Sequence, residues 1–148
     1  MSKNFTCSIQ LASHNFDQYG EKGSVDFEKV IQEFTSFLWI QQLSMANVWS
    51  KPKIIVKNLD NGTECLVSIM EEPNKYNYLL GIVYRKEKST FCGFGKSKIV
   101  RWLEIYVVEE RESMERIFGM FFTKDIELIL AQLKDLPKLN EMEAINYR

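Results

Sequence analysis

The stretch K-I-V-R-W-L-E-I-Y-V-V-E-E, from Lys98 to Glu110, is the strongest strand signal in the chain, because β-branched and aromatic residues follow one another almost without a break. Apolar side chains occupy both alternating sets of positions, so we expect a central strand with both faces covered and Trp102 in the core. Arg101 and Glu104 interrupt the pattern, and such a strand must pair these charges or hold them near an end. The apolar positions are Ile99, Leu103, Ile105 and Val107 on or near one face and Val100, Trp102, Tyr106 and Val108 on the other.

Shorter strand patterns precede this stretch. Residues 4–12 alternate apolar and polar side chains, which predicts a strand with one buried face, and residues 14–23 mix polar residues and glycines as a loop does. Asn61-Gly62 is the preferred pair for a tight hairpin. The short connections between strands predict an antiparallel β-meander. Its strands are expected from Lys53 to the hairpin, from Thr63 to Met70 and from Tyr76 to Tyr84, with a charged connection from Arg85 to Ser89 and a short strand from Thr90 to Phe94.

Two amphipathic helices are expected to pack on this sheet. Ser24 or Asp26 can cap the first, whose apolar positions follow the i, i+3, i+4 rule. Thr123 can cap the second, which ends before Pro137. The apolar positions are Phe27, Val30, Ile31, Phe34, Phe37 and Leu38 in the first helix and Ile126, Ile129, Leu130 and Leu133 in the second.

The segment from Met114 to Phe122 fits either a strand or a helix. We expect a strand because Gly119 is unfavourable inside a helix and the neighbouring apolar residues suit a sheet, although residues 112–116 would start a helix equally well. The predicted fold is therefore a single α+β domain over residues 1–138, mainly an antiparallel meander sheet packed by an N-terminal and a C-terminal helix. Residues 139–148 are expected to form a loose tail.

The composition indicates one cytoplasmic domain. The chain has 148 residues, 45% of them hydrophobic, and a net charge of −1, so any electrostatic recognition must be local. No signal peptide and no apolar run long enough for a membrane span is recognisable. Cys7, Cys65 and Cys92 are odd in number and lie among strand-like residues, which favours reduced core thiols.

No catalytic or metal motif is found, so we expect no enzyme, no cofactor and no metal site. His14, the single histidine, has no second histidine or carboxylate cluster beside it. The string Thr90-Phe91-Cys92-Gly93-Phe94-Gly95-Lys96-Ser97 lacks the first glycine of a phosphate-binding loop. It shares only Gly93-Phe94-Gly95 with the first RNA-recognition signature. A glycine-containing hairpin turn explains the string fully.

Charges are segregated along the chain. Acidic residues gather on two adjacent turns, and basic residues gather between residues 85 and 101. Such separation is found on ordinary solvated surfaces and also at the two poles of a protein-binding face. The candidate partner-binding acids are Asp60, Glu64, Glu71, Glu72, Glu109 and Glu110, and the basic band is Arg85, Lys86, Lys88, Lys96, Lys98 and Arg101.

The chain resembles bacterial immunity proteins of contact-dependent growth inhibition and related polymorphic toxin systems. The resemblance rests on W-x-K-P…L-D-N-G-T…L-V-S…E-E-P…Y-x-Y-L-L-G from Trp49 to Gly81 and on R-W-L-E-I-Y-V-V from Arg101 to Val108. It implies binding of one cognate toxin C-terminal domain in the cytosol, such as a nuclease, whose basic cleft would complement the acidic residues. The alternatives are a nucleic-acid-binding module that uses the basic band with Phe91 and Phe94 as stacking groups, and an enzyme with a carboxylate site.

Overall fold

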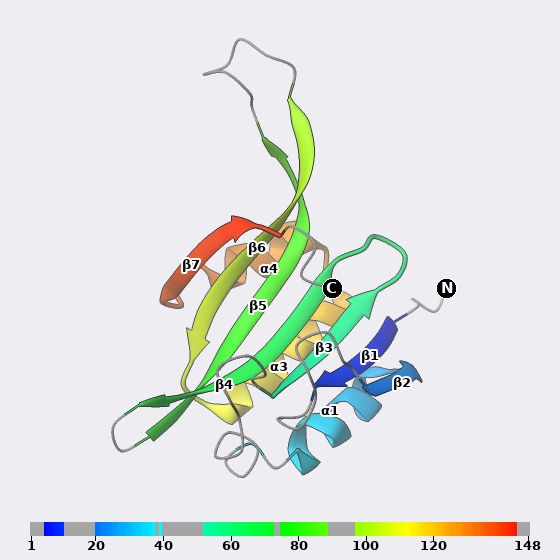
Figure 1. Ribbon diagram of the computed structural model, residues 1–148, viewed down its shortest axis with the longest axis vertical. Helices are drawn as coiled ribbons and strands as arrows, with labels where there is room; N and C mark the ends of the chain where they lie inside the picture. The colour runs from blue at the N-terminus through cyan, green and yellow to red at the C-terminus, as the bar shows by residue number, and fades with distance from the viewer. Residues whose placement is uncertain are drawn as a thin grey trace.

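The computed structural model describes residues 5–10, 20–37, 39, 52–72, 75–88 and 97–144. These residues form one seven-stranded antiparallel sheet, in the order β2-β1-β3-β4-β5-β6-β7, and three helices (Figure 1). The strands are β1 (Phe5–Gln10), β2 (Gly20–Ser24), β3 (Lys53–Asn58), β4 (Glu64–Glu72), β5 (Lys75–Lys88), β6 (Lys98–Val108) and β7 (Lys138–Glu143). The helices are α1 (Phe27–Ser36), α3 (Arg111–Thr123) and α4 (Ile126–Leu133).

The predicted meander is confirmed for the strands from Lys53 to Val108, because β3, β4 and β5 are each hydrogen-bonded to the next strand in the chain. The β3–β4 hairpin turns at the predicted pair, where Gly62 has a φ of 76°. Its turn is closed by hydrogen bonds from the Asn58 amide to the Thr63 carbonyl and from the Gly62 amide to the Asn58 carbonyl, 2.9 and 2.8 Å long. Glycine is suited to this backbone conformation because a Cβ is penalised there.

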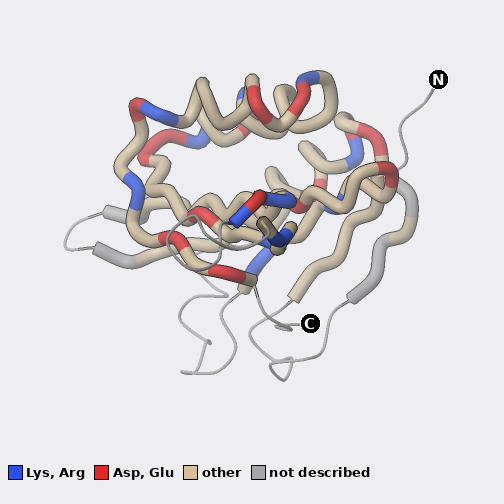
Figure 2. The backbone as a smooth tube through the Cα atoms, turned by 90° about the horizontal axis from the view of Figure 1, so that it is seen from above, with Lys and Arg blue, Asp and Glu red and all other residues tan. Residues whose placement is uncertain are grey.

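The helices cover one face of the sheet, and Figure 2 shows the two layers edge-on. Asp26 caps α1 as expected, since its Oδ1 accepts a 2.8 Å hydrogen bond from the Lys29 amide. The Phe34 ring of α1 lies 5.5 Å from that of Phe118 on α3 and 5.3 Å from that of Tyr78 on β5. These aromatic contacts join both helices to the sheet in one core.

The Lys98–Glu110 stretch forms an interior strand as far as Val108, since β6 is paired with β5 on one side and with β7 on the other. On the helix side Val100, Tyr106 and Val108 are buried, whereas on the opposite side Leu103 is half-buried and Ile99 is 71% exposed. The expectation of two fully covered faces is therefore wrong. Trp102 is half-buried and not in the core, and Lys86 Nζ lies 4.5 Å above its ring.

The segment from Met114 to Phe122 is helical, so the expected strand is wrong. Its buried residues Met114, Ile117, Phe118 and Phe121 follow the i, i+3, i+4 spacing and face the sheet. Gly119 faces the Phe27 ring of α1. Its lack of a side chain does not prevent the segment from being helical. Thr123 ends this helix and does not cap the next, since Asp125 is the N-cap of α4.

Three segments expected to be irregular belong to the sheet. Gly20–Ser24, part of the predicted loop, pairs with β1 as an edge strand. Lys138–Glu143, assigned to the domain end and loose tail, pairs with β6. The connection at residues 85–88 likewise continues β5. Edge strands such as β2 and β7 are held by backbone hydrogen bonds and need no apolar alternation, so periodicity does not reveal them.

Cys7 and Cys65 are buried in the core, as expected, and burial raises the pKa of the Cys65 thiol well above its ordinary value. Cys92, His14 and the predicted 90–94 strand lie outside the described residues, as does the last part of the tail, residues 145–148.

The distribution of burial leads to a stability prediction. We expect Phe118→Ala to lower the free energy of unfolding by about 3–5 kcal/mol, because this side chain is fully buried between the layers. Trp102→Ala should cost clearly less, because the indole is half-buried. Urea denaturation of both variants measures the difference, and equal losses would contradict the assigned core.

Candidate functional site

The structure divides the candidate acids between the two ends of the sheet. Val108 at the end of β6 pairs with Tyr78, and the β4–β5 hairpin continues beyond this point through the pairs Met70–Asn77, Glu71–Tyr76 and Glu72–Lys75. Glu71 and Glu72, of which only the backbone is described, therefore lie at the same end as Glu109 and Glu110 (Figure 1). Asp60 and Glu64 lie at the opposite end, in and after the β3–β4 turn.

Glu64 is an interior residue. Its side chain is fully buried and forms an ion pair with Arg101 on β6, two strands away, on the sheet face opposite the helices. Burying a carboxylate is costly unless a cation and hydrogen bonds compensate it, so Arg101 offsets part of the cost of burying Glu64. Glu64 is therefore no part of an exposed acidic surface, while Asp60 is exposed in its turn.

Glu109 and Glu110 line a groove at the junction of β6 and α3. The other residues of its lining are Val107, Val108, Ser113, Leu136 and Pro137, so apolar walls stand beside exposed carboxylates. The Val107 amide donates a 3.0 Å hydrogen bond to the Pro137 carbonyl and fixes the two walls together. Glu110 is the N-cap of α3, yet its carboxylate makes no capping hydrogen bond and is exposed. The groove can accept a basic or amphipathic group from a partner.

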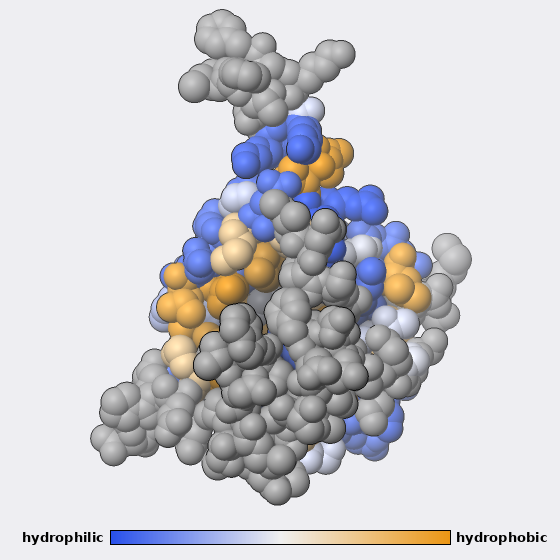
Figure 3. All heavy atoms as spheres, in the orientation of Figure 1, coloured by the Kyte–Doolittle hydropathy of each residue, from blue (hydrophilic) through white to orange (hydrophobic). Residues whose placement is uncertain are grey.

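The basic band also forms a structural unit. β5 and β6 continue past the rest of the sheet as a two-stranded ribbon, and Figure 3 shows hydrophilic side chains around its base. Ile99, near the start of β6, is 71% exposed. Arg85 and Arg101 are directly opposite each other in its register. Several charges are already engaged: Arg101 pairs with Glu64, and Lys88 Nζ lies 3.9 Å from Glu143. Lys96 lies outside the described residues.

Glu104 is the centre of a polar cluster that sequence reasoning did not find. It is buried on the helix side of β6 and accepts a 2.6 Å hydrogen bond from Lys138, whose Nζ also lies 2.9 Å from Glu141. These bonds, first that to Glu104, raise the pKa of Lys138 and keep it charged. Burial, followed by the bond to Glu104, raises the pKa of Tyr84. The raised pKa values keep Lys138 charged and Tyr84 neutral near neutral pH, which fits a role of the cluster in anchoring β7.

Metal-binding groups and membrane-spanning helices were considered for the described part of the chain. Within it, no three His, Cys, Asp or Glu side chains are grouped so that they could hold a metal ion. The helices it contains are too short or too polar to cross a membrane. No protein-family model, curated protein or solved structure matches this chain.

The buried Glu64 leads to a second stability prediction. Arg101→Met should lower the free energy of unfolding by about 2 kcal/mol or more, because it leaves the Glu64 carboxylate without this cation. The control is Arg85→Met at the cross-strand neighbour of Arg101, which should lower it by under about 1 kcal/mol because Arg85 is exposed. Thermal and urea unfolding would measure both, and equal effects would show that the ion pair contributes nothing specific.

Proposed function

We propose that this protein is an immunity protein that binds a cognate toxin C-terminal domain through one end of its sheet. This is the end at which Glu109 and Glu110 lie, and we call it the acidic end. The observation that supports the proposal best is the groove at the β6–α3 junction, where exposed Glu109 and Glu110 stand beside the apolar Leu136 and Pro137. Protein interfaces commonly combine an apolar centre with a polar rim, and complementary charge raises the rate of association.

The position of the acids supports a basic partner. With a net charge of only −1, the chain has no strong overall field, so the carboxylates at this end act locally. Glu112 on the first turn of α3 is exposed as well, and the Glu71–Glu72 backbone lies at the same end of the sheet. A basic cleft, such as that of a nuclease, would meet the exposed carboxylates of Glu109, Glu110 and Glu112 at this end.

The test is a protection assay with the toxin domain encoded by the reading frame that precedes this protein's gene. Cells that express this domain should survive with the wild-type protein and die with the Glu109→Lys/Glu110→Lys variant, whose binding should weaken at least tenfold, or about 1.4 kcal/mol. The control is Asp60→Lys/Glu127→Lys, which changes the charge equally at two exposed sites away from the groove.

Circular dichroism of both double variants should show the wild-type fold. If the Glu109/Glu110 variant protects cells as well as the control does, the interface with the toxin does not lie at the acidic end. A preceding reading frame without a toxic C-terminal domain, or toxicity that the wild-type protein does not relieve, would refute the immunity function itself.

A second candidate function is binding of nucleic acid through the β5–β6 ribbon. The observation in its favour is that Lys86, Lys88 and Lys98 lie together on a projecting pair of strands, and a two-stranded ribbon fits the major groove of duplex DNA. Against it, Lys88 lies near Glu143 and the Lys86 ammonium lies over Trp102.

We expect the purified protein to show no salt-sensitive retention of single-stranded RNA or of single- or double-stranded DNA, because few cations of the ribbon are available for phosphates. Fluorescence anisotropy between about 50 and 200 mM salt measures this, since phosphate contacts weaken steeply over that range. Tight binding that is lost in Lys88→Glu/Lys98→Glu would favour the ribbon function over the immunity function.

A further inference from the structure

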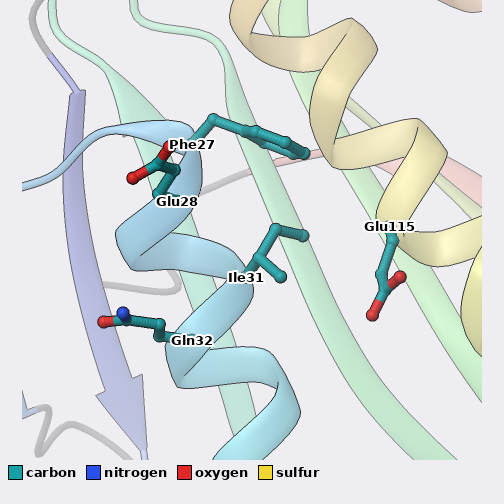
Figure 4. A pocket seen from close by; sticks show the side chains of 5 residues that line it. All are labelled: Phe27, Glu28, Ile31, Gln32 and Glu115. Carbon is teal, nitrogen blue, oxygen red and sulfur yellow. The ribbon is translucent and has the colours of Figure 1, made fainter.

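The outer surface of the helical layer carries a second groove, between α1 and α3 (Figure 4). It encloses about 450 Å³ and is lined by Phe27, Glu28, Ile31, Gln32 and Glu115, with mostly apolar surface exposed inside. Figure 4 shows the Phe27 and Ile31 side chains pointing from α1 toward α3, while Glu28 and Gln32 point away from the space between the helices. The groove thus has an apolar floor and polar margins.

The apolar floor is incompletely covered by the protein itself. Phe27 is 39% exposed although its ring contacts Phe122 at 6.1 Å. The ring lies over Gly119 of α3, where an added Cβ would come within 3.7 Å of it, so α3 presents almost no side chain at this point. Ile31 is half-buried one turn further along α1. Covering these two side chains would remove additional apolar surface from water.

The margins of the groove are acidic. α1 and α3 with their N-caps carry six carboxylates and three basic side chains. Two of the bases are used within their own helices, since Lys29 Nζ lies 3.3 Å from Glu33 and Arg111 Nε lies 3.3 Å from Glu115. The acids are Asp26, Glu28, Glu33, Glu110, Glu112 and Glu115, and the remaining base is Arg116. Of these acids, Glu28 and Glu115 line the groove itself. A cationic ligand is therefore favoured over an anionic or neutral one.

We infer that the groove between α1 and α3 docks a basic amphipathic helix of a partner protein. Phe27 and Ile31 are one helical turn apart, about 6 Å along the axis, so a parallel or antiparallel helix can place apolar side chains at i and i+4 against them. Lysine or arginine side chains on its flanks reach Glu28 on one side and Glu115 on the other. The exposed i, i+4 pair of Arg111 with Glu115 is weak enough to be shared with an incoming cation.

This inference goes beyond the proposed function, because it concerns the helical layer and does not require a toxin domain or the acidic end of the sheet. The two sites lie at different places on α3: Glu110 and Ser113 face the β6 junction, whereas Glu115 and Gly119 face α1. They can therefore be tested separately.

The experiment uses the full chain and two synthetic peptides of identical leucine and lysine composition. One peptide has the leucines at helical i, i+3, i+4 spacing, and the other has the same residues in an order without that period. We expect the amphipathic peptide to bind saturably and at least tenfold more tightly than the scrambled one, by fluorescence anisotropy at physiological salt. Amide chemical-shift changes in a heteronuclear NMR spectrum should cluster in residues 27–32 and 111–119.

The variant Glu28→Lys/Glu115→Lys should weaken binding of the amphipathic peptide at least tenfold, while the control Asp60→Lys/Glu127→Lys should bind as the wild type does within about twofold. Thermal unfolding confirms that both variants are folded. The inference would be overturned by any of three results: equal binding of the two peptides, chemical-shift changes confined to the β6–α3 junction, or an unchanged peptide affinity of the Glu28→Lys/Glu115→Lys variant. A concentration-dependent dimer whose interface covers Phe27 and Ile31 would also overturn it, since a second copy would then occupy the groove.

Discussion

The contact of Phe34 on α1 with Phe118 on α3 joins the two helices to each other and to the sheet. The rest of the structure depends on this contact. Both rings are almost fully buried, and Tyr78 completes the contact from β5. Burying large aromatic side chains supplies much of the free energy that opposes chain entropy in a domain of this size. Because Phe118 fixes α3 on the sheet, the first turn of this helix is held at the end of β6, where the acidic groove forms.

The antiparallel meander separates charges along the direction of the strands. Each hairpin returns the chain to the end from which it started, so turns that are distant in sequence come together at one end of the sheet. Glu71 and Glu109 are brought to one end in this way, and Arg85 and Arg101 to the other. A chain with almost no net charge thereby acquires two local surfaces of opposite character, and both candidate functions rest on them.

Charges inside the fold follow a different rule. Glu64 and Glu104 are buried on opposite faces of the sheet, and each is paired with a cation contributed by another strand, Arg101 and Lys138. The sequence alone shows that Arg101 and Glu104, the charges that interrupt β6, must be paired if they are buried, because an uncompensated buried charge is too costly. It does not show the identity of the partners, since β4 and β7 lie far away in the chain.

The sequence by itself determined the elements whose signals are local: the strand at Lys98, the glycine turn at Gly62, a helix cap at Ser24 or Asp26 and the order of the meander. These features follow from side-chain alternation, backbone conformation and capping, which act over a few residues. Only the tertiary structure decided that residues 114–122 form a helix, because their apolar side chains suit either period until a sheet is present for one face to cover. The tertiary structure also decided that Lys138–Glu143 forms an edge strand and that Glu64 is buried against Arg101 instead of lying on the acidic surface. It decided as well that Phe27 and Glu115 line the same groove. Each of these features depends on segments that only folding brings into contact.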